Sequence, residues 1–193
     1  MPHIDLEEHL PGITSLLEYR RDSAEPIRNL TQLLMRGAST LTEGERELIA
    51  TVVSHGNQCR FCTAAHASVT NSLLGECETV EAIKQDIETA PVTEKMKALL
   101  SIASLVQKSG KLVTSESVGR AKSAGATDLE IHDTVLIAAL FSLYNRYVDG
   151  LATNMPKDES YFKNLTERLT TQGYRRNPGG YDHLKEVVNL DKP

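Results

Sequence analysis

Residues 42–75 read TEGERELIATVVSHGNQCRFCTAAHASVTNSLLG, and this stretch predicts two helices joined by a short turn. Thr42 is followed three residues later by Glu45, a spacing that is typical of the capping box at a helix start. Behind this box, apolar residues recur at helical spacing as far as Ser54. The sequence therefore predicts a first helix over residues 43–54.

The second helix of this pair follows a short turn. Gly56 and Asn57 favour the turn, and Asn57 is a good N-cap for the helix behind it. We expect that helix to cover residues 58–74 and to end at Gly75, because glycine is common just past a helix C-terminus. Two successive helices of this kind favour a helical bundle.

The rest of the chain shows helical patterns too. Strand signals are absent, because aromatic residues are few and no long stretch alternates apolar with polar residues. A second capping box, Thr127 with Glu130, opens a long apolar helix. Further helices are predicted over residues 24–36, 79–88, 94–108, 114–123, 128–151 and 158–172. We therefore predict an all-α helical bundle of about seven to nine helices.

These helices are expected to form a single domain over residues 1–193, since that length suits one hydrophobic core. Residues 1–22 are expected to form an irregular leader with at most one helical turn. A C-terminal helical extension is expected over residues 153–193, and we expect its last part, residues 173–193, to wrap over a neighbour.

Composition and charge exclude several classes of protein. The net charge is −5 and the nearest approach to a basic run, residues 174–176, is short, so we expect no nucleic-acid partner. The longest apolar run, residues 135–141, is too short to span a bilayer, and the acidic N-terminus does not resemble a signal peptide. Three cysteines do not make a secreted disulfide framework. We therefore expect a cytoplasmic protein without a membrane partner.

Two cysteines and a histidine lie near the start of the second predicted helix. Cys59 and Cys62 are three residues apart and His66 follows four residues later, so all three share one helix face. Cα atoms at the cysteine spacing are about 5–5.5 Å apart, which suits a disulfide. The helix start favours a thiolate, and a histidine can accept the thiol proton. The pair is therefore suited to switch between dithiol and disulfide.

One carboxylate precedes this pair on the first predicted helix. Glu47 lies twelve residues before Cys59, on a narrow strip that it forms with the small residues Ala50, Thr51 and Ser54. If this strip faces the cysteine helix, Glu47 can orient a histidine or accept a proton. Such a site suits peroxide reduction: one sulfur attacks the peroxide and becomes a sulfenic acid, and the other condenses with it to a disulfide. An external dithiol then restores both thiols.

The spacing of Glu47, Cys59, Cys62 and His66 resembles the signature of the alkylhydroperoxidase D-like, or carboxymuconolactone decarboxylase, family. The segment ERELIATVVSHGNQCRFCTAAH, residues 45–66, resembles that family throughout the two-helix unit. This set of spaced residues is fairly specific, whereas the helical remainder of the chain is not.

A later segment, TDLEIHDTVLIAALFSLYNRYVDGL at residues 127–151, resembles the closing helix of the family's peroxidase-related branch. The resemblance covers residues 20–152. It implies an all-helical fold that forms homo-oligomers (dimers, trimers or hexamers) and that reduces small-molecule peroxides, either organic hydroperoxides or hydrogen peroxide. It implies no bound cofactor and no metal. The external reductant would be a dithiol such as a lipoyl group, carried by a lipoylated or thioredoxin-like protein.

The resemblance also implies roles for single residues. Glu47 and His66 would form the proton relay, and Cys59 and Cys62 the redox pair. We favour Cys62 as the sulfur that attacks peroxide, because His66 lies one turn beyond it, and Cys59 would then resolve the intermediate and meet the reductant. The helix dipole instead favours Cys59 as the more acidic thiol, so both assignments stay open.

One position departs from the family pattern. The best-known members have a histidine directly before the second cysteine, where this chain has Phe61. The relay is then short of one member, and His55 is a candidate substitute in space.

Other interpretations of these residues also stay open. The fold could carry a carboxymuconolactone-type decarboxylase, or a redox-sensing module without catalytic turnover. His55, Cys59, Cys62 and His66 are four possible zinc ligands, although one helix strains a tetrahedral site. The two thiols could also be ordinary core residues, and Cys77 is expected to be incidental.

Overall fold

The computed structural model describes residues 1–158 and 160–185. In these ranges the chain forms nine α-helices, one 3-10 helix and no strand. The α-helices are α1 (Ile13–Tyr19), α2 (Arg21–Arg36), α3 (Glu43–Gly56), α4 (Arg60–Leu74), α5 (Glu78–Gln85), α6 (Glu94–Lys108), α7 (Ser115–Ser123), α8 (Asp128–Gly150) and α9 (Tyr161–Gln172), and the 3-10 helix η1 is Gly110–Leu112. The predicted all-α fold is confirmed.

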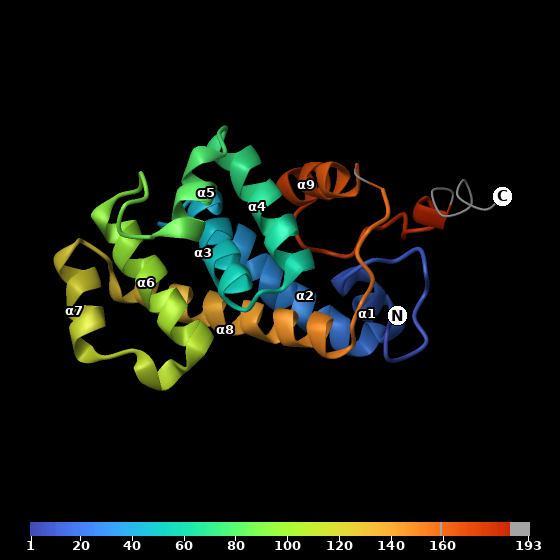
Figure 1. The fold of residues 1–193 in the computed structure, drawn as a ribbon, viewed down its shortest axis with the longest axis horizontal. Coiled ribbons are helices and arrows are strands. Elements are labelled where there is room, and N and C mark those ends of the chain that lie inside the picture. Colours follow the sequence, from blue (N-terminus) through green and yellow to red (C-terminus); the bar gives the residue numbers. More distant parts are fainter. Residues whose placement is uncertain (159, 186–193) are drawn as a thin grey trace.

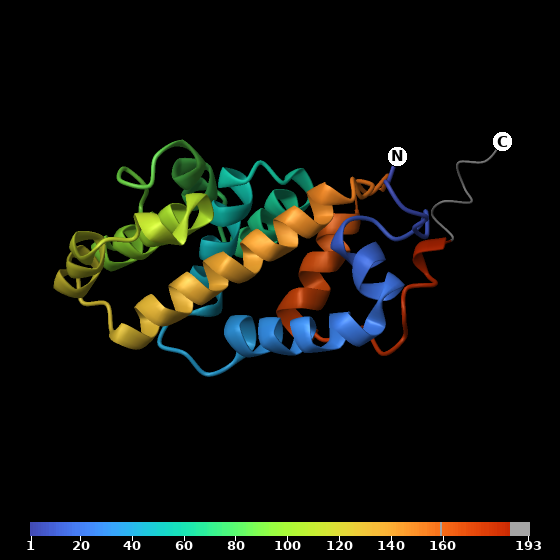
Figure 2. The same cartoon turned by 90° about the horizontal axis from the view of Figure 1, so that it is seen from below.

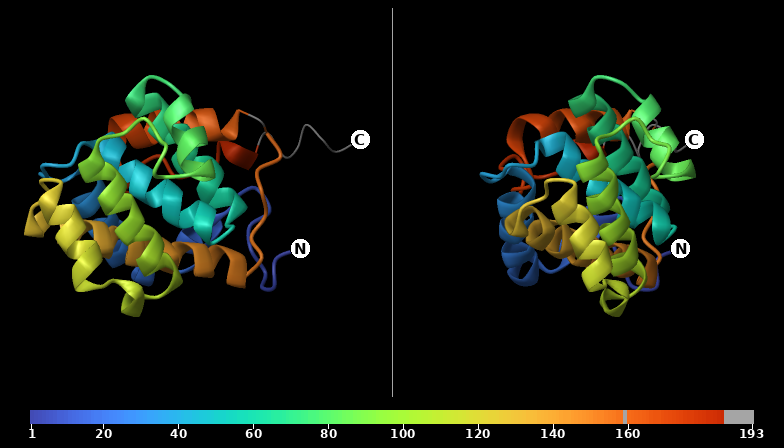
Figure 3. Two further views of the ribbon diagram at one scale, coloured as in Figure 1. Left: turned by 60° about the vertical axis from the view of Figure 1, so that its left-hand side comes forward. Right: turned by 90° about the vertical axis from the view of Figure 1, so that its left-hand side faces the viewer.

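The pair formed by α3 and α4 lies at the centre of the molecule. α3 packs most extensively against α4 and also contacts α6 and α8, while α9 packs on α4. Figure 1 shows α6 and α7 at one end of the molecule, and α1 with the N-terminus at the other. The long helix α8 runs through much of the distance between these ends (Figure 2). Figure 3 shows α2 and α9 on one side of the bundle, with α6 on the opposite side.

Both predicted capping boxes are present. At the start of α3, Thr42 Oγ1 accepts from the Glu45 amide at 3.2 Å, and Glu45 Oε2 accepts from the Thr42 amide at 2.8 Å. At the start of α8, Thr127 and Glu130 make the same two bonds at 3.1 and 2.8 Å. Each box satisfies amides that have no partner within the helix, which fixes where α3 and α8 begin.

The prediction that Asn57 caps the second helix is wrong. Asn57 follows the last residue of α3, and Cys59 is the N-cap of α4. The Asn57 amide is occupied elsewhere, because its Nδ2 donates to Asn145 at 2.8 Å and its Oδ1 accepts from Gln107 at 2.9 Å. Gln58 bridges the two helices with a left-handed φ of 60°. As a result α4 starts two residues later than predicted.

The prediction of an irregular leader is wrong for its second half. Residues 13–19 form α1, and α2 begins at Arg21 rather than Ala24. Leu16 and Leu17 of α1 are buried in the bundle, so tertiary packing stabilises a helix too short to be evident from its own sequence. Pro26 lies inside α2 with its side chain exposed, and it does not end the helix.

The neighbour over which the C-terminal extension wraps is this chain's own N-terminal region. The Tyr174 amide donates to Gln32 Oε1 of α2 at 2.6 Å. Arg176 forms an ion pair with Glu18 of α1 at 2.8 Å. Residues 173–185 therefore tie the end of α9 back to α1 and α2, and the remainder of the predicted extension lies outside the described residues.

The core is built from aliphatic side chains of several helices. The largest fully buried ones include Leu16, Met35, Leu48, Ile49, Leu99, Leu100, Ile137 and Phe141. Among the helices of the described ranges, none combines the length and apolar content needed to cross a membrane.

Candidate functional site

The four predicted site residues lie on the central helix pair and all are buried. Glu47 on α3 and Cys59 before α4 are 0% exposed, and Cys62 and His66 on α4 are 3% and 7% exposed. The small-residue strip of α3 faces α4, since Thr51 Oγ1 lies 3.1 Å from the hydroxyl of Thr70. The helix pair therefore brings Glu47 to His66 across a narrow interface.

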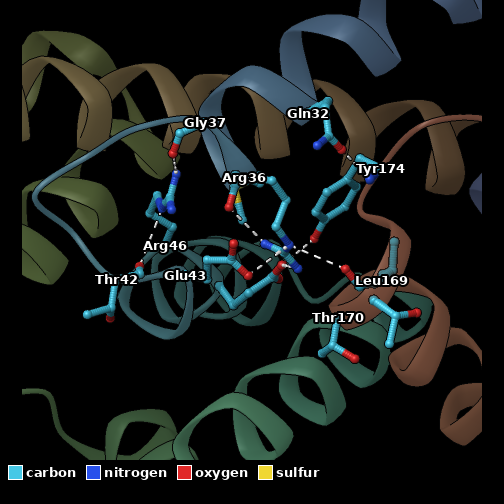
Figure 4. Close-up of polar contacts among 12 residues, drawn as sticks. Gln32, Arg36, Gly37, Thr42, Glu43, Arg46, Leu169, Thr170 and Tyr174 are labelled. Carbon is cyan, nitrogen blue, oxygen red and sulfur yellow. Dashed lines mark hydrogen bonds and ion pairs between the residues drawn. The ribbon is translucent and has the colours of Figure 1, made fainter.

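Glu47 is the centre of a hydrogen-bond network. Its Oε2 lies 2.8 Å from His66 Nδ1. Its Oε1 accepts from Arg36 Nη2 at 2.6 Å and from the Tyr174 hydroxyl at 2.5 Å. Figure 4 shows the Arg36 side chain from α2 and the Tyr174 side chain from the segment after α9 pointing toward the same place. Three helices and the C-terminal segment thus meet at one carboxylate.

The surroundings of Glu47 fix its charge. Burial alone raises the pKa of a carboxyl group, but the hydrogen bond from His66 and the charge of Arg36 outweigh it and lower the pKa of Glu47. Burial and the charge of Glu47 raise the pKa of Tyr174 well above its usual value, so the phenol keeps its proton. With a carboxylate as its acceptor, His66 Nδ1 carries a proton, and Nε2 is left to accept one.

The two cysteines of the pair are reduced and adjacent. Cys59 is the N-cap of α4 and Cys62 lies in its first turn, and neither forms a disulfide. The hydrogen bond with Cys59, together with burial, raises the pKa of the Cys62 thiol, while a hydrogen bond with Asn145 acts in the opposite direction. Cys62 therefore rests as a thiol rather than the thiolate that the helix start alone would favour, and its attack requires a base.

A small cavity of about 70 Å³ opens onto this site. Cys62 and His66 both line it, together with Phe141 and Tyr144 of α8 and Tyr174. Cys59 is not among its lining residues and is fully buried. The cavity thus gives a small ligand access to the Cys62 sulfur beside the imidazole.

A chain of side-chain amides lies behind the cysteines. Asn145 Nδ2 donates to Ser54 Oγ at 3.1 Å, and Asn145 Oδ1 accepts from Asn57 at 2.8 Å. The same Asn145 contacts the Cys62 thiol. Its neighbour Arg146 donates to the Ser142 carbonyl at 3.0 Å. Asn145 therefore holds the start of α4 against α8.

Phe61 stands where the best-known family members have a histidine, and His55 is the candidate substitute for that histidine. Phe61 is 3% exposed, and its ring packs against Tyr161 and Phe162 of α9, with centroid distances of 6.1 and 5.7 Å. This position is therefore apolar because α9 covers it. His55 is exposed at the end of α3, so it does not share the buried surroundings of the site residues, and its candidacy as a substitute for the missing histidine gains no support.

Sequence reasoning missed Arg36 and Tyr174. Arg36 is the last residue of α2 and Tyr174 follows α9, so neither belongs to the helix pair that carries the motif. Arg36 lies directly before the predicted end of its helix at Gly37, where a basic residue is common for reasons unrelated to a site. No local spacing connects either residue with Glu47.

The zinc alternative finds no support in the geometry. Within residues 1–158 and 160–185, no group of three or more histidine, cysteine, aspartate or glutamate side chains is arranged to hold a metal ion. His55 is exposed to solvent, whereas Cys59, Cys62 and His66 are buried.

Comparison with known proteins relates one part of the chain to a known family. Residues 21–100, which run from α2 into α6, match the model of the carboxymuconolactone decarboxylase family. The predicted resemblance to this family is confirmed. The matched carboxymuconolactone decarboxylase segment contains Glu47, Cys59, Cys62 and His66.

Two solved structures share the fold. One is described as an uncharacterized peroxidase-related protein from Silicibacter sp. TM1040; it is 25% identical, with 79% of this chain and 78% of that chain covered and a TM-score of 0.71. The other is described as the alkylhydroperoxidase AhpD core of an uncharacterized peroxidase-related protein from Ralstonia eutropha JMP134; it is 26% identical, with 79% of each chain covered and a TM-score of 0.72. A search among curated proteins gave no match. At the level of the family, these likenesses support a peroxidase-like enzymatic role.

Proposed function

We propose that this protein is a thiol-dependent peroxidase and disulfide reductase, with Cys59 and Cys62 as the redox pair and Glu47 and His66 as the proton relay. The observation that carries the proposal is that His66, oriented by Glu47 at 2.8 Å, lines the same small cavity as Cys62. The cytoplasmic location expected from the sequence and the homo-oligomeric assembly implied by the resemblance are part of the proposal.

The first half of the reaction consumes the peroxide. His66 Nε2 accepts the Cys62 proton, since Nδ1 is held by Glu47. The Cys62 thiolate attacks one peroxide oxygen and the O–O bond breaks, which leaves a sulfenic acid on Cys62. The departing alkoxide or hydroxide takes the proton back from His66 and leaves as an alcohol or water. The ionised Glu47 stabilises the imidazolium formed between these two transfers.

The second half restores the thiols. The Cys59 sulfur attacks the Cys62 sulfur, and the sulfenic hydroxyl leaves with the Cys59 proton as water. Two electrons have then passed from the two thiols to the peroxide, and Cys59 and Cys62 share a disulfide. An external dithiol, such as a lipoyl group on a partner protein, reduces this disulfide by exchange and becomes a disulfide itself. No bound cofactor takes part in these steps.

The direct test is peroxide consumption with dihydrolipoamide or dithiothreitol as the reductant. We expect the unsubstituted protein to turn over, and the Cys62→Ser and Cys59→Ser variants to lose at least a hundredfold in rate. Cys77→Ser is the matched control, because Cys77 is exposed and lies outside the site, and it should keep the full rate. Absence of turnover with every dithiol, or a full rate in Cys62→Ser, would refute the proposal.

A further inference from the structure

Arg28 of α2 is a buried cation with unused hydrogen-bond donors. The residue is 6% exposed, and its Nη2 donates to Glu18 Oε1 at 3.0 Å. Its Nε and Nη1 atoms are buried and have no hydrogen-bond partner in the part of the chain that the structure describes. Buried donors without acceptors destabilise a fold, so such a guanidinium points to a missing acceptor.

The charge around Arg28 is not neutralised by Glu18. Glu18 also pairs with Arg21 at 3.2 Å and with Arg176 at 2.8 Å, so one carboxylate is shared among three arginines. Burial raises the pKa of Glu18, but the hydrogen bond to Arg176 and the charges of these arginines outweigh it and lower that pKa. Glu18 is therefore ionised, and it contributes one negative charge against the three positive charges of the arginines. The cluster keeps a net positive charge in a chain whose overall charge is −5.

Arg28 lines the same cavity as Cys62 and His66. Arg168 and Arg175 line it as well, and its lining residues include no aspartate or glutamate. Arg168 donates only to the Arg175 carbonyl, at 3.4 Å, among the hydrogen bonds found in the described ranges. The residues that line the cavity therefore include a cysteine, a histidine and three arginines, and no acidic residue.

Tyr144 lines this cavity together with Arg28 and Cys62. Its hydroxyl is 2.6 Å from the Thr31 hydroxyl on α2, and it lies close enough to both Arg28 and Cys62 for each to affect the phenol's ionisation. A ligand that contacts Arg28 is therefore held near the Cys62 sulfur.

We propose that the cavity binds the carboxylate of a short-chain organic hydroperoxide, with Arg28 as the residue that selects it. The Arg28 guanidinium pairs with the carboxylate, and the hydroperoxide end lies at Cys62. Arg168 and Arg175 at the mouth attract the anion. The redox part of this assignment rests on the proposed function, whereas binding of a carboxylate does not.

The binding test uses propionate, a carboxylate without a reactive group, and propionamide, its neutral counterpart. Calorimetry on the reduced protein should show saturable binding of propionate and none of propionamide. Arg28→Met should weaken propionate binding at least tenfold, and Arg28→Lys should weaken it less, since the charge remains. Arg120→Met is the control, because Arg120 forms an exposed ion pair with Glu88 and does not line this cavity, and it should bind propionate normally. Equal binding of the two probes, or unchanged binding in Arg28→Met, would overturn the proposal.

A second test needs no variant and no peroxide. Iodoacetate is anionic and iodoacetamide is neutral, and mass spectrometry reports the alkylation rate of each cysteine. We expect the rate ratio of iodoacetate to iodoacetamide to be at least tenfold higher at Cys62 than at the exposed Cys77 of the same molecule. Equal ratios would contradict the anion site. Selective propionate binding without peroxide turnover would keep the anion site while removing the peroxidase, and would favour a carboxylate substrate of another reaction.

Discussion

Glu47 is the single residue on which most of the site depends. It is fully buried and is contacted by His66, Arg36 and Tyr174. These partners come from α4, α2 and the segment after α9. A charge in such a place is stable only while its partners remain, and removal of one member of a buried pair is more costly than replacement of both.

Replacement of Glu47 with glutamine should damage both stability and chemistry. The Glu47→Gln variant leaves Arg36 without its buried counter-charge, which costs about 3–5 kcal/mol of unfolding free energy, and frees His66 to rotate. Because the pKa of Glu47 is lowered in the folded state, its contribution is present above about pH 4.5 and is lost as the pH falls. Denaturant unfolding at several pH values should therefore show a weaker acid dependence in the variant.

The matched control for that change is Glu43→Gln. Glu43 also contacts Arg36, at 3.3 Å, but its side chain is 40% exposed. We expect this variant to lose no more than about 0.5 kcal/mol, as is usual for exposed pairs. A loss as large as that of Glu47→Gln would contradict the central place given to Glu47.

Tyr174 has a role that can be separated from its packing. Tyr174→Phe keeps the ring but removes the hydroxyl that donates to Glu47 at 2.5 Å. We expect about a 3- to 30-fold loss in kcat/KM for peroxide and a loss of about 1–2 kcal/mol in unfolding free energy. Tyr161→Phe removes another buried hydroxyl, 3.3 Å from Thr14, and should leave kcat/KM unchanged. Equal effects of the two variants on kcat/KM would show that the Tyr174 contact is structural only.

At the scale of helices, the start of α4 decides what the cysteines can do. Cys59 lies at the N-cap and Cys62 in the first turn, so both sulfurs lie at the end of the helix that faces α8 and α9 rather than in its middle. The turn before them contains Gln58 in the left-handed region. Helix α9 packs over Phe61 and closes one side of the site.

Restoration of the family histidine at position 61 should destabilise this protein. The Phe61→His variant places a polar ring in a buried aromatic contact with Tyr161 and Phe162. We expect a loss of about 2–3 kcal/mol in unfolding free energy, measured by chemical denaturation at pH 8, where the imidazole is neutral. A variant as stable as the original protein would show that α9 does not require an aromatic residue there.

The helices were predictable to the extent that their signals are local. The capping boxes at Thr42 and Thr127 are complete within four residues, and both are present. The approach of Glu47 to His66 follows from helix spacing on two adjacent helices. Asn57 was misassigned because its amide is used by the distant Asn145 and Gln107, and contacts across the bundle leave no trace in local sequence.

At the scale of the whole molecule, the site is closed by segments far apart in the chain. Arg36 and Tyr174 are separated by more than a hundred residues, and the Arg36 guanidinium lies 5.0 Å from the Tyr174 ring centre. Neither could be assigned from sequence, because their meeting depends on how α9 returns to α2. A substitution far from the site should therefore change the stability of the bundle without changing the chemistry at the cysteines.

Glu130 tests that separation, because it lies at the start of α8, away from the cysteines. Burial raises its pKa, but Lys95 at 2.8 Å, the Thr127 amide and Thr40 at 2.9 Å lower it to about 2. Its contribution is therefore complete above about pH 4.5 and is lost as the pH falls toward 2. We expect Glu130→Gln to lower the unfolding free energy at pH 7 by about 1–3 kcal/mol without changing peroxide turnover, and the exposed Glu116→Gln to change neither.

The most direct test of the central claim is a titration of free thiols against peroxide, followed by mapping of the bond formed. One equivalent of peroxide should consume two thiols per chain, yield a disulfide between Cys59 and Cys62, and leave Cys77 free; in Glu47→Gln the same bond should form more slowly. If Cys59 and Cys62 stay reduced under peroxide, or if the oxidation maps to Cys77, the assignment of a redox pair served by Glu47 and His66 is contradicted.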